Sequence, residues 1–131
     1  MARFIFPMQN ILNMKEKLEE QAKNNYSQAN ARLREAEEEE QRLKNRQHEM
    51  EGELAEKLSM SLDVLEIKRL EDGIEVLKMY VMQQRLVVIQ RKRDVDEARE
   101  KLNEAMKERK TFEKLREHAF EDFVKEVNAA E

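Results

Sequence analysis

Apolar residues recur along the chain at alternating spacings of three and four positions, the pattern of a helix that presents one narrow seam to a partner helix. A first stretch comprises Tyr26, Ala29, Leu33, Ala36, Glu40, Leu43, Gln47, Met50 and Leu54, and extends less cleanly back through Ala22, Leu18, Leu12 and Ile11. A second comprises Ile67, Leu70, Ile74, Leu77, Val81, Gln84, Val88, Arg91, Val95, Ala98, Leu102, Ala105, Arg109, Phe112, Arg116, Ala119 and Phe123. Most positions of both stretches are apolar, and the others are Glu, Gln or Arg. A mean spacing of about 3.5 residues predicts left-handed supercoiling.

The phase of this pattern breaks at residues 57–61, which places a turn at about residues 59–62 between helices at about 7–58 and 63–127. Pro7 suits a first helical turn, and Asp63 with Glu66 resembles a capping box, with Ser59 or Ser61 as alternative caps. Two helices joined by a short turn run antiparallel, so residues whose numbers sum to about 121 should face each other. We predict a single all-α domain over residues 1–131: a long, rod-shaped, two-helix antiparallel coiled-coil hairpin.

Composition supports this prediction and excludes several classes. Charged residues make up 41% of the chain, with two glycines and one proline, and the 25 basic residues nearly cancel the 29 acidic ones, which argues against disorder. A net charge of -4, with acids beside the basic residues 91–93, argues against nucleic-acid binding. The absence of cysteine fits a cytoplasmic protein. We expect no secretory signal in the first twelve residues and no membrane insertion.

Few residues could support catalysis. His48 and His118, the two histidines, lack a histidine partner four residues away, and Gly52 and Gly73 cannot form a phosphate-binding loop. The run of glutamates at 37–40 is interpreted as a solvated helix face rather than a calcium site. We therefore predict a protein that is not an enzyme, with no catalytic, cofactor-binding or metal-binding residues and no cofactor.

The placement of the phenylalanines is more informative. All five lie near the chain ends, which a hairpin brings together. The predicted apolar tip comprises Phe4, Phe6, Met8, Ile11, Phe112, Leu115, Phe120 and Phe123, with Ile5, Val124 and Val127 beside them. Two interpretations remain open: the rings lock the chain ends, or the tip docks into a partner, as exposed apolar patches often do.

A second group of apolar residues, Met79, Met82, Leu86 and Ile89, falls on a face that adjoins the main seam of the second helix. A helix with two apolar stripes often contacts a third element, and methionine-rich surfaces adapt to their partners. A wide seam, or self-association in a dimer, would explain the same pattern.

The chain ends also suggest a family. Residues 4–12 (FIFPMQNIL) resemble the N-terminus of the FliJ family, the stalk proteins of flagellar type III export that are also called flagellar export chaperones. Residues 95–102 (VDEAREKL) and 108–117 (ERKTFEKLRE) are similar to the C-terminal helix of the family, and residues 62–67 (LDVLEI) to the start of its second helix.

This resemblance implies a hairpin like the central stalk of rotary ATPases. Its end with both termini would insert into the hexameric export ATPase, and the protein would also contact the export-gate membrane protein and handle export chaperones, at the cytoplasmic face of the cell membrane. The family's gate-binding patch would fall at Gly73, Leu77, Tyr80 and Gln84, where Gly73 replaces a bulky residue. Because members commonly continue with a short charged tail, we expect a shortened or variant C-terminal end here.

Two other classes of protein would make different demands on the sequence. A prefoldin-like or cytoskeletal coiled-coil module would share the hairpin without requiring phenylalanine at both ends. A tRNA-binding helical arm would need a basic stripe, and neighbouring glutamates neutralise every candidate stripe in this sequence.

Overall fold

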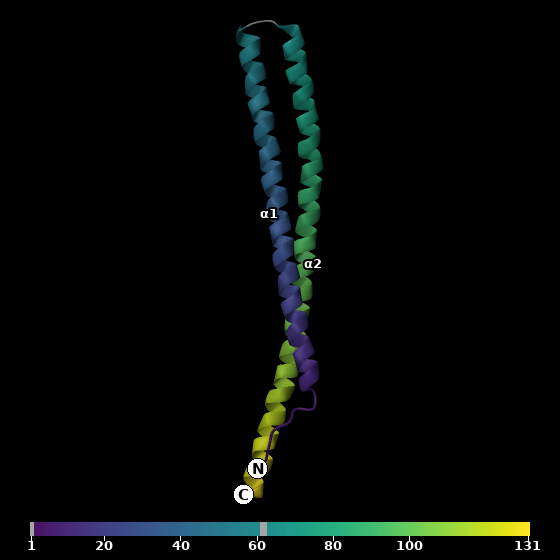
Figure 1. Cartoon of the computed structure of the whole chain (residues 1–131), viewed down its shortest axis with the longest axis vertical. Coiled ribbons are helices and arrows are strands. Elements are labelled where there is room, and N and C mark those ends of the chain that lie inside the picture. The colour runs from purple at the N-terminus through teal and green to yellow at the C-terminus, as the bar shows by residue number, and fades with distance from the viewer. Residues whose placement is uncertain (1, 61–62) are drawn as a thin grey trace. The chain divides into compact units, whose positions relative to one another are not determined.

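The computed structural model describes residues 2–60 and 63–131, and these residues form two long helices (Figure 1). Helix α1 spans Gln9–Met60 and helix α2 spans Val64–Ala130. The helices pack against each other, and the described residues contain no strand, which confirms the predicted all-α hairpin. Of the turn placed at residues 59–62, the first two residues are still helical, while Ser61, an alternative cap, and Leu62 lie outside the described residues.

Local hydrogen bonds explain where the helices begin. Pro7 and Met8 form a turn before α1, and the Gln9 amide donates to the Phe6 carbonyl at 3.0 Å. At the start of α2, the Asp63 carboxylate accepts a 3.4 Å hydrogen bond from the Glu66 amide, so Asp63 is the N-cap. The Glu66 carboxylate pairs with Lys57 of α1 at 3.0 Å. Helix α2 continues three residues beyond its predicted end, to Ala130.

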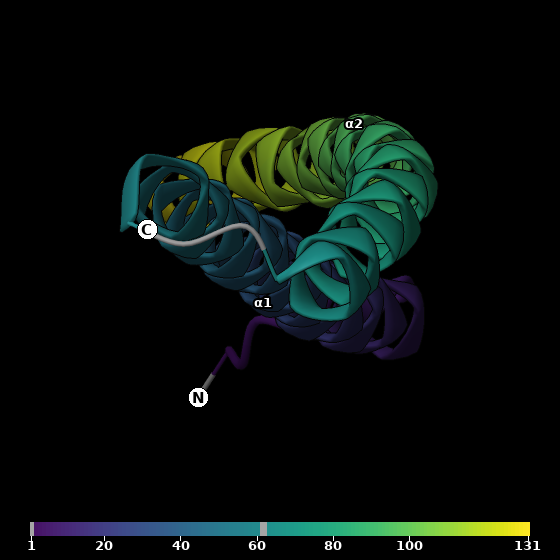
Figure 2. The same cartoon turned by 90° about the horizontal axis from the view of Figure 1, so that it is seen from above.

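The backbone divides into two compact units. The terminal unit comprises residues 1–28 and 96–131, and the turn unit comprises residues 29–95. In the terminal unit the antiparallel pairing is marked by Gln9 with Arg116 and by Lys15 with Glu108. In the turn unit, where the helices lie side by side in both views (Figures 1 and 2), the Gln84 amide donates to the Ala36 carbonyl at 3.0 Å. Each unit therefore has the antiparallel arrangement predicted from the short turn between the helices.

The core is the predicted seam. All the first-stretch positions from Tyr26 to Leu54 are buried or half-buried, and so are all the second-stretch positions except Arg116, which is exposed. The buried residues of α2 recur at every seventh position: Ile74, Val81, Val88 and Val95. Burial of such a side chain contributes roughly 1.5 to 3 kcal/mol, so a narrow row of aliphatic residues can hold two helices together.

The extension of the first seam toward the N-terminus differs from the prediction. Ile11 and Leu18, expected in the seam, are exposed, whereas Leu12 and Glu19 are buried. These two residues lie seven positions apart and continue the seam back from Tyr26 with an exact heptad spacing. The prediction of Leu18 was wrong because a charged residue takes the buried position that hydrophobicity alone assigns to its neighbour.

Candidate protein-docking site at the chain ends

Three aromatic rings gather where the N-terminal segment meets the last turns of α2, within the terminal unit. The ring centroid of Phe4 lies 5.2 Å from that of Phe120, in an edge-to-face arrangement with an interplanar angle of 80°, and 5.6 Å from that of Phe123. The centroids of Phe120 and Phe123 are 6.4 Å apart. These distances are typical of favourable aromatic pairs, so residues 2–8 are held against α2 by ring contacts.

Cationic side chains complete this contact. The Arg116 guanidinium lies 5.5 Å from the centroid of the Phe4 ring, and its Nε donates to the Gln9 side-chain carbonyl at 2.9 Å. Lys15 of α1 lies 5.9 Å from the ring of Phe112 and pairs with Glu108 at 2.9 Å. Arg116 is exposed although its position belongs to the seam pattern, because its side chain covers the Phe4 ring instead of entering the core.

The eight predicted tip residues differ in exposure. Phe6 is buried, and Phe4, Met8, Phe112 and Phe123 are half-buried. Ile11 and Leu115 are exposed, and Phe120 keeps 49% of its surface accessible. Beside them, Ile5 is 73% exposed and Val124 is also exposed. The rings therefore fix the N-terminal segment on α2, while Phe120 and Val124, one helical turn apart, and Ile5, next to Phe4 in the chain, stay accessible as an apolar edge that can bind another protein.

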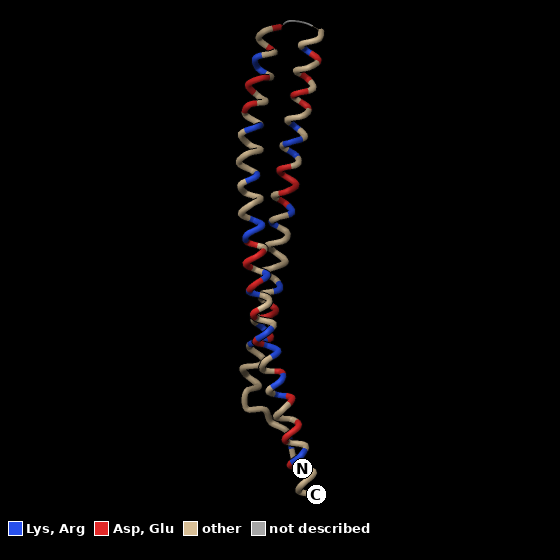
Figure 3. Tube along the Cα trace, turned by 180° about the vertical axis from the view of Figure 1, so that it is seen from behind, with Lys and Arg blue, Asp and Glu red and all other residues tan. Residues whose placement is uncertain are grey.

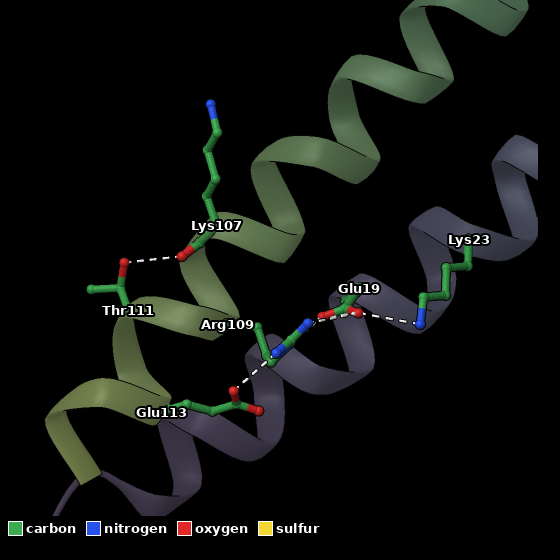
Figure 4. Close-up of polar contacts among 6 residues, drawn as sticks. All are labelled: Glu19, Lys23, Lys107, Arg109, Thr111 and Glu113. Carbon is green, nitrogen blue, oxygen red and sulfur yellow. Dashed lines mark hydrogen bonds and ion pairs between the residues drawn. The ribbon is translucent and has the colours of Figure 1, made fainter. Parts of the chain in front are cut away.

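A buried ion pair lies further along the terminal unit, between Arg109, which the sequence pattern placed in the seam, and Glu19, which it did not. Arg109 of α2 donates to both carboxylate oxygens of Glu19 on α1, from Nε at 2.5 Å and from Nη2 at 3.3 Å (Figure 4). Its Nη1 also donates to Glu113 at 2.9 Å, and Lys23 lies 3.2 Å from Glu19. Glu19 is only 6% exposed. This two-pronged geometry fixes the helices at one register.

The pair shifts the ionisation of both partners. The hydrogen bond from Arg109, helped by Lys23, lowers the pKa of Glu19 below its usual value, although burial acts in the opposite direction. The hydrogen bonds to Glu19 and then to Glu113 raise the pKa of Arg109 above its already high value. Both groups are therefore charged at neutral pH. The heptad spacing from Leu12 through Glu19 to Tyr26 was the signal that could have located this pair.

The predicted export-gate patch lies in the turn unit, and most of it faces the other helix. Gly73, Leu77 and Gln84 are half-buried, and a side chain at Gly73 would meet Met50 of α1. The Gln84 amide bonds across to α1, as described above. Tyr80 alone of the four is exposed. The most accessible member of this patch is therefore Tyr80.

The described residues contain neither a cluster suited to a metal ion nor a helix suited to span a bilayer. Over residues 2–60 and 63–131, no group of three or more His, Cys, Asp or Glu side chains is arranged to hold a metal ion. Within the same ranges, neither helix contains a stretch apolar enough and long enough to cross a membrane. Basic and acidic residues are interspersed along both helices (Figure 3).

Residues 4–131 match the family model described as Flagellar FliJ protein. The chain belongs to the FliJ family. No curated protein and no solved structure gives a significant individual match. Membership of the FliJ family assigns the chain a role in flagellar protein export, as a component of the export apparatus rather than as an enzyme.

Proposed function

We propose that this FliJ-family protein is the stalk of the flagellar export ATPase. In this proposal the tip inserts into the hexameric ATPase and promotes its assembly and activity, and the protein itself performs no catalysis and needs no cofactor. It works at the cytoplasmic face of the cell membrane, where it links the ATPase to the export-gate membrane protein and escorts export chaperones.

The accessible apolar edge of the terminal unit is the observation that carries this proposal. Two helices bury their common seam without it, yet Ile5, Phe120 and Val124 remain exposed at or beside the rings that are packed together. Exposed aromatic and aliphatic groups on a rigid support are typical of protein-binding hot spots. The ring contacts that hold residues 2–8 on α2 provide that support, because they fix the edge before a partner binds.

The contact with the export gate is assigned to Tyr80, the exposed member of the predicted patch. A tyrosine offers an apolar ring and a hydroxyl group, and tyrosines are enriched in protein interfaces. Replacing Tyr80 with alanine should weaken binding to the gate protein and leave stimulation of the ATPase unchanged. Equal loss of both activities would contradict this division of the two contacts.

The proposal is tested by ATP hydrolysis and hexamer formation of the flagellar export ATPase from the same organism. We expect the wild-type protein to raise both and the double variant Ile5→Ser/Phe120→Ser to abolish the effect. Neither side chain lies in the seam, so circular dichroism should report unchanged helix content, although Phe120→Ser also removes the ring contact with Phe4. The matched control is Val64→Ser/Leu65→Ser at the start of α2, where two side chains are 73% and 72% exposed.

Each result separates the candidate functions. If the wild-type protein did not stimulate the ATPase, the proposed role as its stalk would be refuted. A coiled-coil interaction module of another kind, such as a prefoldin-like or cytoskeletal one, would then be favoured. Stimulation that survives in the tip variant, or that is lost in the control variant, would show that the tip is not the surface that binds the ATPase.

A further inference from the structure

Helix α2 carries a second row of apolar side chains outside the seam, in the turn unit. Met79, Met82, Leu86 and Ile89 are 60%, 67%, 65% and 47% exposed. Helix α1 therefore leaves them uncovered, and they are not the edge of a wide seam. The neighbouring seam positions Val81 and Val88 are buried, so the row lies on a different face of the same helix.

The spacing of this row identifies the kind of element that fits it. Its members follow at intervals of three, four and three residues, which is the repeat of a coiled-coil seam. Side chains at these intervals form one continuous stripe along a helix, and a second helix is the element that packs along such a stripe. Two of the four residues are methionines, which adapt to the shape of a partner.

The residues that flank the stripe identify the charge of the partner. One flank carries a cation at every seventh residue, and all three are exposed: Lys78, Arg85 and Lys92. The other flank carries uncharged residues at the same interval: Val76, Gln83 and Gln90. Flanking positions of two packed helices face each other, so acidic residues on the partner would meet the cationic flank, in which Lys78 already pairs with Glu75 of α2 at 3.3 Å. The other flank has no acid at residues 76, 83 and 90 that would repel such a partner.

A second copy of this chain would place few acidic residues opposite the cationic flank. In an antiparallel pair of stripes, Arg85 would face Arg85 of the other copy, and Lys78 would face Lys92. In a parallel pair, Lys78 and Arg85 would face the uncharged Gln83 and Gln90, and only Lys92 would meet an acid, Glu97. We propose that this stripe binds an acidic amphipathic helix of another protein. The stripe shares no residue with the tip, so the proposal does not depend on binding to the ATPase.

The test uses two labelled peptides as probes, each about four heptads long, with leucine at the seam positions and either Glu or Lys at every flanking position. Like charges on the flanks keep each probe from pairing with itself. Fluorescence anisotropy should show binding of the acidic probe. Met82→Gln/Leu86→Gln should weaken this binding by about tenfold or more, because two apolar side chains that the probe would bury are lost. The control Leu58→Gln/Met60→Gln, at exposed positions of α1, should bind as the wild type does.

Charge reversal provides the second arm. Lys78→Glu/Arg85→Glu/Lys92→Glu should lose the acidic probe and gain the basic one, whereas Arg32→Glu/Arg34→Glu/Arg46→Glu, an equal change of charge on exposed positions of α1, should keep the wild-type preference. The proposal is overturned by no binding of the acidic probe, by equal binding of both probes to the wild type, or by a stripe-dependent dimer in sedimentation velocity.

Discussion

The two helical glycines provide a quantitative test of how α1 and α2 are paired. Alanine is more favourable than glycine in a helix interior by about 0.8 to 1 kcal/mol. A methyl group added at Gly52 would meet no atom within 4 Å, so Gly52→Ala should gain the full amount. At Gly73 the added carbon would lie 2.5 Å from Cε and 3.5 Å from Sδ of Met50. Because Met50 is flexible, it can turn away at a cost of about 0.5 to 1 kcal/mol, so Gly73→Ala should gain only about 0 to 0.5 kcal/mol.

A double-mutant cycle isolates this contact. In a Met50→Ala background the obstructing side chain is gone, and Gly73→Ala should gain about 1 kcal/mol, as Gly52→Ala does. The assay is urea unfolding followed by circular dichroism. With a slope of about 2 kcal/mol per M, 1 kcal/mol moves the midpoint by about 0.5 M.

Two outcomes of these measurements would contradict the prediction. The same gain from Gly73→Ala in both backgrounds would mean that Gly73 does not face Met50, and the antiparallel register of the turn unit would then be wrong. A loss of stability in Gly52→Ala would mean that this face of α1 is covered by another surface.

Three further predictions concern the terminal unit and the seam. The pKa of Glu19 is lowered in the folded state, so its pairing with Arg109 stabilises the fold fully above pH of about 4.5 and is lost as the pH falls through the lower folded value; acid unfolding of Glu19→Gln should lack this component. Val81→Ala should cost about 2 kcal/mol in urea unfolding, whereas Val64→Ala, at an exposed site, should change stability by less than about 0.5 kcal/mol, and equal effects would contradict the assigned seam. Phe4→Ala should lower the NMR order parameters of residues 2–8 and leave those of both helices unchanged; unchanged order parameters in residues 2–8 would show that the ring contacts do not hold this segment.

Periodicity made most of the fold predictable from the sequence. A helix that packs along one partner must repeat its apolar residues at heptad spacing, and positions such as Ile74 and Val88 carry that repeat without interruption. The cap at Asp63 was also visible, because its short carboxylate side chain can reach the amide of Glu66 three residues later. The rule placed Glu40, Arg91 and Arg109 in the seam, where they are half-buried, but it missed Glu19 in favour of its neighbour Leu18.

The candidate site was less predictable, for two physical reasons. The segment before α1 has no repeat, so its sequence indicates neither that Phe4 contacts α2 nor that Phe6 is buried. The gate patch was assigned by resemblance, and periodicity had already placed two of its four residues, Leu77 and Gln84, in the seam, where the structure leaves them half-buried. The exposure of Phe120 likewise depends on how the helices end, which composition does not specify.

Photo-crosslinking from position 120 to the hexameric export ATPase tests the central claim most directly. With Phe120 replaced by p-benzoylphenylalanine, we predict crosslinks to the ATPase, and with Leu65 replaced in the same way, we predict none. Crosslinks from position 65 alone, or from neither position, would contradict the account.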